Sequence, residues 1–406
     1  MAKLGQIPLI DRSSGKFAGA AFLLSRRSPL SYSISFDNGA IVELRSNNNY
    51  VVARLGFIAR ADDALQSGHE IIQHALDHLS ITGESSLTIR DSSDEYFIWW
   101  LENHQKIVLR AVSTTILNFE VFPAKAIVRD QHGNEIRSSL PILPRCHPAF
   151  RYFRLSQITD DLYDAYRNMY LAFELLLSSQ YPKGNEKEID WLNRGLTASL
   201  TPLNLTALLP PNTVDPIATI IQKIYEDARL PLFHAKEGKG FFIPQSIGHR
   251  HIVAEALQLL TNIVLRMSEA WQGVRYLGGA VYPGWVYRNM SDYLSACRML
   301  ASSDSSSFDP ATVDLSHARY LEGVWMNASL APQLSTDQSP VLLGVLNQTD
   351  FGLLNSVWRF EVVDTERPLI AHTLEDELTI EGIDRLECQL NTRVSNTRRP
   401  RSLFAR

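Results

Sequence analysis

Residues 155–181 read LSQITDDLYDAYRNMYLAFELLLSSQY, and this stretch decides the prediction of the fold. Its apolar side chains recur at steps of four and three residues, which is typical of one face of a helix: Leu162, Tyr166, Met169, Phe173 and Leu176. Further helical patterns follow in 186–200, in 215–228 and in the long run after Gly248, with Asp215-Pro216 as an N-cap followed by proline at the first helical position. Four or more helices joined by short loops predict an all-α bundle over about residues 155–272.

The regions on both sides of this stretch have a period of two residues. SYSISFDNGAIVELR, residues 31–45, consists of two alternating runs joined by Asp37-Asn38-Gly39, which predicts a hairpin because Asn and Gly tolerate positive φ. One helical pattern, residues 61–79, interrupts the N-terminal strands, and SVWRFEVVD at 356–364 begins a second strand-rich region. These patterns predict an antiparallel sheet with one helix before the bundle and a small sheet after it.

The predicted fold class is therefore a multidomain α+β protein with a central all-α bundle between separate β regions. SLPILPRCHPAF, residues 139–150, has three prolines and predicts a linker, and the serine-rich stretch from Ala301 predicts another. The predicted boundaries are an α+β sheet domain at 1–145, the helical bundle at 150–300, a small β-rich domain at 315–395 and a basic tail at 396–406.

Composition and charge exclude some classes of protein. The 406 residues carry a formal net charge of −5, so whole-chain basicity does not indicate nucleic-acid binding, which would need a local patch. The three cysteines form no CxxC pair, so neither a disulfide framework nor a zinc knuckle is indicated. The N-terminal sequence has no continuous apolar segment and no later run approaches membrane-spanning length, so we predict cytoplasmic residence without membrane association.

The stretch IYEDARLPLFHAKEGKGFF, residues 224–242, offers the clearest candidate for chemistry. Proline is tolerated only in the first turn of a helix, so Pro231 predicts that a helix begins near Arg229, with His234 one turn inside it. The positive end of the helix dipole and its unpaired N–H groups would then favour a phosphate at this point. Arginine grips a phosphoryl group with two donors, and histidine moves protons near neutral pH. The plain alternative is an arginine at a helix end and a histidine that packs locally.

A second constellation is the pair His74 and His78, four residues apart on the predicted N-terminal helix. This spacing places two imidazoles on one helix face, as in helical zinc sites, and would suit a metal-dependent hydrolase. No third ligand is obvious in the sequence, so solvated surface histidines are the alternative that we favour.

The order of helical segments around the Arg-x4-His pattern resembles the HEPN superfamily. The helix containing FELLL, the helix ending in IY-x3-R, the following x4-H and the last long helix carry this resemblance over residues 155–272, and IYEDARLPLFHAK is similar to HEPN domains of methylamine-utilisation J-type and abortive-infection proteins. The resemblance implies a helical bundle that dimerises. It also implies a metal-independent endoribonuclease, in which motif residues of two subunits line one composite cleft and no cofactor is needed.

Roles for individual residues follow from the resemblance. Arg229 would bind and stabilise the scissile phosphate, and His234 would act as general acid or base. Glu174 would be the acidic residue of the first helix that orients the arginine; its alternative role is a flank position of an amphipathic helix. The substrate-binding candidates are Lys236, Lys239 and Tyr225. The implied partners are RNA, a second copy of the chain in a homodimer and a regulatory or antitoxin protein, as for a toxin or a defence effector.

The sequence departs from the family pattern beside the motif arginine. Leu230 and Ala228 stand where polar residues are common in active members. This departure keeps a second hypothesis open: a non-catalytic HEPN-like dimerisation and binding module that presents β domains to a macromolecular partner.

Overall fold

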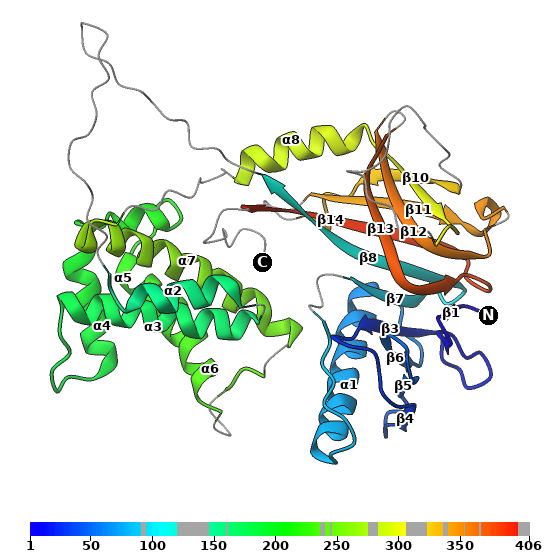
Figure 1. Ribbon diagram of the computed structural model, residues 1–406, viewed down its shortest axis with the longest axis horizontal. Coiled ribbons are helices and arrows are strands. Elements are labelled where there is room, and N and C mark those ends of the chain that lie inside the picture. The colour runs from blue at the N-terminus through cyan, green and yellow to red at the C-terminus, as the bar shows by residue number, and fades with distance from the viewer. Residues whose placement is uncertain are drawn as a thin grey trace, which may run out of the picture. The chain divides into compact units, whose positions relative to one another are not determined.

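Figure 1 shows the computed structural model of the chain, which folds into two compact units. The sheet unit comprises Met1–Leu117 and Val281–Val394, and the helical unit comprises Asn118–Ala280 and Ser395–Arg406. The residues that the structure describes are 1–90, 95–119, 146–159, 161–235, 240–243, 246–274, 283–305, 323–335, 340–352, 354–364 and 367–396.

Fourteen strands of the described residues form one sheet in the sheet unit. Its N-terminal strands are β1 (Lys3–Leu4), β2 (Ile7–Pro8), β3 (Ala18–Leu23), β4 (Tyr32–Ser35), β5 (Ile41–Leu44), β6 (Tyr50–Leu55), β7 (Glu95–Glu102) and β8 (Lys106–Phe119). Its C-terminal strands are β9 (Arg298–Ser302), β10 (Val324–Leu330), β11 (Val341–Asn347), β12 (Ser356–Asp364), β13 (Arg367–Thr379) and β14 (Arg385–Asn396). The spatial order is β2-β1-β13-β12-β9-β10-β11-β14-β8-β7-β3-β6-β5-β4.

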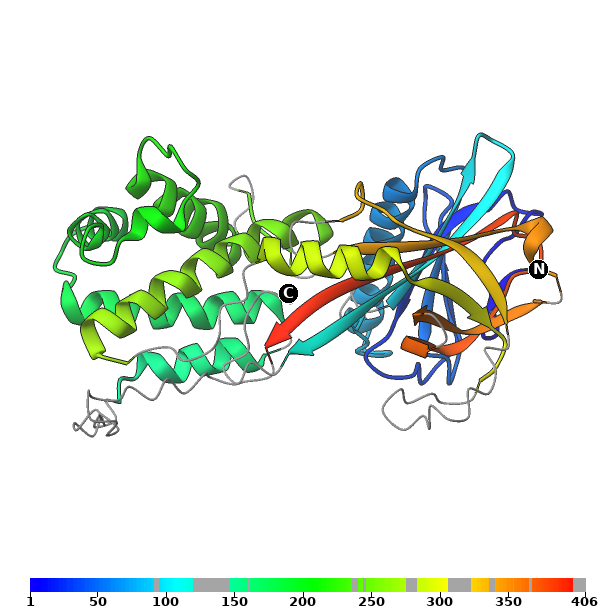
Figure 2. The ribbon, with the colours of Figure 1, turned by 90° about the horizontal axis from the view of Figure 1, so that it is seen from above.

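This order corrects the predicted fold class, because the two β regions are not separate flanks of a central bundle. Strands from both ends of the chain form a single sheet, in which the C-terminal strands lie between two groups of N-terminal strands. β1 pairs with β13, and β14 lies beside β8. Contacts between β8 and β14 advance in the same direction, from Ile107 with Asp384 to Thr114 with Asn391, so these two strands run parallel within an otherwise largely antiparallel sheet. Figure 2 shows their arrowheads, cyan and red, at the same end.

Strand β3 shows how one sheet serves two cores. Ala20 and Phe22 face the core beneath helix α1 (Ala61–Ile81), whereas Ala21 and Leu23 face the core shared with the C-terminal strands. This alternation follows from the two-residue period of a strand. At Gly68 of α1 an added Cβ would lie 2.5 Å from the Cβ of Ala20, so glycine allows the helix to approach the sheet closely.

Ion pairs within the sheet unit connect segments that are distant in sequence. Arg110 Nε donates to Glu387 Oε2 at 2.7 Å, and Arg385 holds Glu102 with two hydrogen bonds of 2.7 and 2.8 Å. These bonds cross the β8–β14 junction. The N-terminal and C-terminal parts of the sheet are therefore joined by side chains as well as by backbone.

Between Ala149 and Ala280, the described elements of the helical unit are helices. They are α2 (Ala149–Ile158), α3 (Leu162–Gln180), α4 (Glu188–Ser199), the 3-10 turn η1 (Leu205–Leu208), α5 (Pro216–Ile221), the π-helix η2 (Gln222–Arg229), α6 (Leu230–Phe233) and α7 (Ile247–Gln272). Helix α3 supplies the centre of their common core, where Tyr166, Tyr170 and Phe173 are buried against α7. The predicted inward stripe of α3 is thus buried as its spacing indicates.

Some of the remaining predictions concern residues outside the described ranges, or residues next to them. Most of the proline-rich linker, Lys236, Lys239 and residues 397–406 of the basic tail lie outside the described residues. The serine-rich stretch begins differently from the prediction, because Ala301 and Ser302 belong to β9 and are buried between β10 and β12. The helix α8 (Pro283–Ser295) and the 3-10 turn η3 (Gln348–Asp350) belong to the sheet unit.

Candidate functional site

The helix that carries the motif runs without a break from Pro216 to Phe233. It begins at Asp215, whose side chain accepts a hydrogen bond from Ala218 N at 3.0 Å, with Pro216 at the first position as predicted. The prediction that a new helix begins near Arg229 is wrong. Arg229 ends the π-helical segment and His234 is the C-terminal cap of α6. The motif therefore lies at the negative end of the helix, and the predicted anion site on a helix N-terminus does not exist here.

The π-helix explains how Pro231 fits inside this helix. In a regular α-helix the proline ring would collide with the carbonyl four residues earlier. Here Leu230 N donates to Tyr225 O, five residues back, so a widened turn comes directly before the proline. π-helical segments within α-helices occur often at functional sites. Arg229 is the last residue of this one, and His234 follows five residues later.

Arg229 and His234 meet at this helix end. Arg229 Nη1 lies 3.4 Å from His234 Nε2. The arginine side chain is only 17% exposed, whereas the histidine is exposed. A guanidinium and an imidazole therefore lie side by side at the surface of the helical unit. The guanidinium is mostly buried, and the imidazole is open to solvent.

Three aromatic rings surround the guanidinium of Arg229. Its Cζ lies 5.3 Å from the ring centroids of Tyr225 and Phe233 and 5.7 Å from that of Tyr170. Such cation–π contacts attract the charge through the ring quadrupole and limit the directions that the side chain can take. Tyr225, predicted as a substrate-binding residue, is thus a wall of the arginine site.

Glu188 is the anion that holds Arg229. Its Oε1 lies 3.2 Å from Arg229 Nη2 and accepts a hydrogen bond of 3.4 Å from the Tyr170 hydroxyl. Glu188 is the first residue of α4, where a helix N-terminus favours negative charge. Nothing in the sequence distinguishes Glu188, since an acidic residue in a first helical turn is common. Only the packing of α4 against α5, which continues into the segment that ends at Arg229, brings it to the arginine.

Glu174, the predicted orienting acid, completes a pair of carboxyl groups. Burial raises the pKa of Glu174 to about 7; the negative charge of Glu188 and a hydrogen bond with it act in the same direction, and Arg229 acts in the opposite one. Near neutral pH the Glu174 carboxyl therefore retains its proton in much of the population. Arg229 forms its ion pair with Glu188 and also interacts with Glu174 through its charge.

The tyrosines of the site are uncharged donors. Burial raises the pKa of Tyr225, and the negative charge of Glu188 raises it further. The pKa of Tyr170 is raised for the same main reason, with the charges of Glu174 and Glu188 adding to it. Both hydroxyls therefore remain protonated and can donate to the carboxyl pair.

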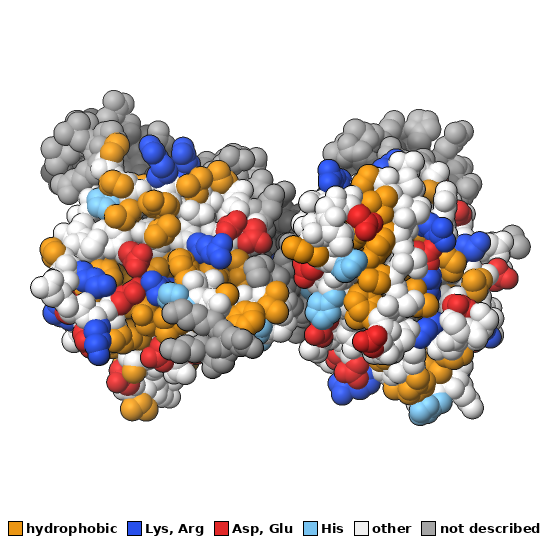
Figure 3. All heavy atoms as spheres, turned by 90° about the horizontal axis from the view of Figure 1, so that it is seen from below, with side chains coloured by type: hydrophobic (Ala, Val, Ile, Leu, Met, Phe, Trp, Pro, Cys, Tyr) orange, Lys and Arg blue, Asp and Glu red, His pale blue; other side chains and the backbone are white. Residues whose placement is uncertain are grey.

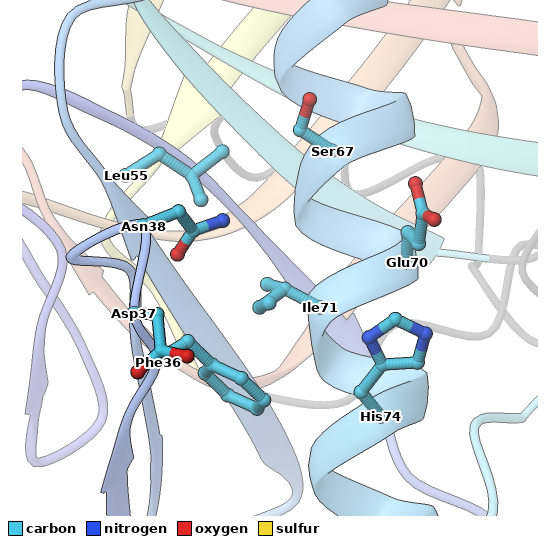
Figure 4. A pocket seen from close by; sticks show the side chains of 8 residues that line it. All are labelled: Phe36, Asp37, Asn38, Leu55, Ser67, Glu70, Ile71 and His74. Carbon is cyan, nitrogen blue, oxygen red and sulfur yellow. The ribbon is translucent and has the colours of Figure 1, made fainter.

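A hollow in the sheet unit offers a second place for binding. It has a volume of about 420 Å³ and lies between α1 and the β4–β5 hairpin, as Figure 4 shows. Its lining consists of Phe36, Asp37, Asn38, Leu55, Ser67, Glu70, Ile71 and His74.

The two histidines of the predicted alternative, a zinc site at His74 and His78, have different surroundings. His78 Nδ1 is hydrogen-bonded to the Tyr32 hydroxyl at 3.1 Å, and His74 faces the hollow instead. No three His, Cys, Asp or Glu side chains gather to hold a metal ion in the part of the chain that the structure describes.

Charge on the molecular surface is mixed. Figure 3 shows Lys and Arg side chains interspersed with Asp and Glu and with exposed apolar side chains over the described part of one face. This agrees with the small negative net charge. Because the net charge is negative, recognition of a polyanion would depend on local basic groups such as Arg229.

The chain was compared with known families and proteins. No family of known proteins, no curated protein and no solved structure matches it. The resemblance to HEPN domains therefore stays a prediction from the motif. Among the described residues no helix has the length and apolar character needed to cross a lipid bilayer.

Proposed function

We propose that the helical unit is a HEPN-type, metal-independent endoribonuclease that uses Arg229 and His234. The observation that supports this proposal most is the 3.4 Å approach between Arg229 Nη1 and His234 Nε2 at an exposed helix end. A fixed cation beside an accessible imidazole is the minimum that phosphodiester cleavage needs when the attacking group is the RNA 2′-OH.

The reaction is a transfer within the RNA. The 2′-oxygen loses its proton to a base and forms a bond to the adjacent phosphorus, while the bond from phosphorus to the 5′-oxygen breaks. The departing 5′-oxygen takes a proton from an acid, which leaves a 2′,3′-cyclic phosphate and a free 5′-OH. His234 serves as base or acid, and a second chain in the homodimer supplies the complementary group across a twofold axis.

Arg229 stabilises the charge that develops on the non-bridging phosphate oxygens. Its guanidinium presents Nη1 towards His234 and Nη2 towards Glu188. The ion pair and the three rings hold it in place, so little reorganisation is needed when the phosphate arrives. Flexible surface arginines lack this support.

Cleavage that resists EDTA is the primary test. We expect His234→Ala to lower the rate by about 10²–10⁴-fold, the usual contribution of a general acid or base. Arg229→Ala should lower it by about 10²–10³-fold, as for loss of a preorganised donor to developing charge. Matched controls in the same unit are His251→Ala, an exposed histidine of α7, and Arg194→Ala, whose partner is the surface residue Glu186.

Two outcomes of this test would reject the proposed metal-independent nuclease site at Arg229 and His234. Cleavage abolished by the chelator would assign the activity to a bound metal, and unchanged cleavage in both motif variants would assign it to another site. The second candidate function, a silent dimerisation and binding module, is favoured by one observation: Glu188 already neutralises Arg229. A stable dimer of the wild-type chain that never cuts RNA would support that candidate.

A further inference from the structure

Phe233, directly before the motif histidine, has an unusual position for a large apolar residue. It is 37% exposed at the end of α6, although the ring packs near the buried Tyr170 at a centroid distance of 6.2 Å. A single exposed phenylalanine is common on protein surfaces and needs no function. Phe233 differs from such a residue because two arginine side chains lie beside its ring.

Two guanidinium groups contact the ring of Phe233. Arg229 Cζ lies 5.3 Å from its centroid and Arg167 Cζ lies 5.8 Å from it. Arg167, on α3, forms an ion pair of 3.2 Å with Asp164, and both side chains are about half exposed. Such surface pairs contribute little in water, so Arg167 can exchange Asp164 for a phosphate at small cost.

A neighbouring segment places a second exposed ring at the same helix end. Phe242 N donates to Pro231 O at 2.9 Å, which fixes residues 240–243 beside α6. The ring of Phe242 is not the exposed one, because it stacks on the ring of His249 with centroids 4.4 Å apart. Phe241, next to it, is 42% exposed.

We propose that Phe233 and Arg167 form a stacking subsite for an unpaired nucleobase next to the scissile phosphate. Aromatic rings and arginine planes that alternate at a surface bind bases through stacking and bind the backbone through charge. The base that stacks on Phe233 leaves its neighbouring phosphate within the region of Arg229 and His234. This inference rests on the proposed function for the identity of the ligand, but the subsite itself is tested by binding alone.

The test measures binding in full-length His234→Ala protein, so that cleavage does not interfere. The probe is a single-stranded RNA oligonucleotide with one 2-aminopurine, whose fluorescence is quenched when the base stacks. Phe233→Leu in this background should remove the quenching and weaken affinity on the order of tenfold, in line with the loss of one stacked base. Phe233→Tyr should retain both signals, which separates the role of the ring from an effect on folding.

The matched control is Phe57→Leu, an exposed phenylalanine of the sheet unit. It should leave quenching and affinity unchanged. Arg167→Ala should weaken binding and reduce the slope of log affinity against log salt by about one unit.

The outcomes separate this inference from the proposed function. Binding that does not depend on Phe233, in protein whose wild-type form cuts RNA, would overturn the subsite and leave the nuclease. Binding that depends on Phe233, in protein whose wild-type form never cuts, would overturn the nuclease and leave the subsite. No RNA binding by the His234→Ala protein, together with no binding or cleavage by the wild-type protein, would overturn both.

Discussion

Arg359 in the sheet unit and Arg229 in the helical unit are both held by glutamates, but their surroundings differ. Arg359 Nε lies 2.6 Å from Glu361, and both side chains are almost fully buried, at 6% and 2% exposure. Arg229 is 3.2 Å from Glu188, both are about a fifth exposed, and an exposed histidine touches the arginine. The first pair is buried within a sheet, with Asp304 as a further partner of the arginine at 3.2 Å, whereas the second is open on the side of the exposed His234. We infer that Arg359 serves the fold and Arg229 serves chemistry.

Breaking the buried pair should have the largest effect on stability. Arg359→Ala leaves Glu361 buried with an uncompensated charge, which costs about 3–5 kcal/mol of the free energy of unfolding. Arg229→Ala should cost less, about 1–3 kcal/mol, because the Glu188 that it leaves unpaired is about a fifth exposed and reaches solvent more than Glu361 does. Denaturant unfolding of both variants measures the difference. Equal losses would show that the two arginines are equivalent supports of the fold and would remove the comparison.

Changing the partner of Arg229 should have a smaller effect, confined to catalysis. Glu188→Gln keeps the shape and removes the charge that holds the guanidinium, so we expect kcat for RNA cleavage to fall about tenfold, roughly 1.4 kcal/mol of barrier. The affinity for RNA should stay the same or improve, since one negative charge leaves the site. Glu188 is a positioning residue, and an increase in KM with an unchanged kcat would contradict that role.

The smallest effect concerns Glu174 and depends on pH. Its pKa of about 7 in the folded protein lies above its ordinary 4.5, so the folded state binds this proton more tightly than the unfolded chain does. The contribution to stability is complete below about pH 4.5 and is lost as the pH rises to about 7. Glu174→Gln should lack this dependence, with a difference on the order of 1 kcal/mol after allowance for partial solvation. Parallel stability–pH curves for the two proteins would contradict it.

Local signals in the sequence predicted local structure well. The Asp37-Asn38-Gly39 turn connects β4 and β5 with Gly39 at φ +76°, and Asp215 caps its helix. In both cases the deciding interactions lie within a few residues. The helical spacing on α3 is a signal of the same kind.

The order of the strands in the sheet could not be predicted from such local signals. Arg110 and Glu387 pair across 277 residues, and no local pattern of charge or periodicity indicates that β8 and β14 are neighbours. In the sequence, the alternating strand pattern of each β region suggests a separate and complete small sheet. The error in the predicted fold class follows from this, because sheet pairing over such a separation is decided by tertiary packing.

The candidate site was predictable in composition and not in geometry. The motif spacing selected Arg229 and His234, whereas Pro231 suggested a helix start that a π turn makes unnecessary. Glu188 could be recognised only from the packing of α4 against α5, which brings it to Arg229. Phe233 and Arg167 were hidden for the same reason, since their contact joins two helices.

The central claim is that Arg229 and His234 act together on a phosphodiester whose own 2′-OH is the nucleophile. The most direct measurement compares an RNA oligonucleotide that has one preferred cleavage site with the same oligonucleotide carrying a 2′-deoxy sugar at that position, in EDTA, with product ends identified by mass. We predict 2′,3′-cyclic phosphate ends from the all-RNA substrate, and no cleavage at the deoxy position or by His234→Ala protein. Equal cleavage of both substrates, or products with 5′-phosphate ends, would contradict the account.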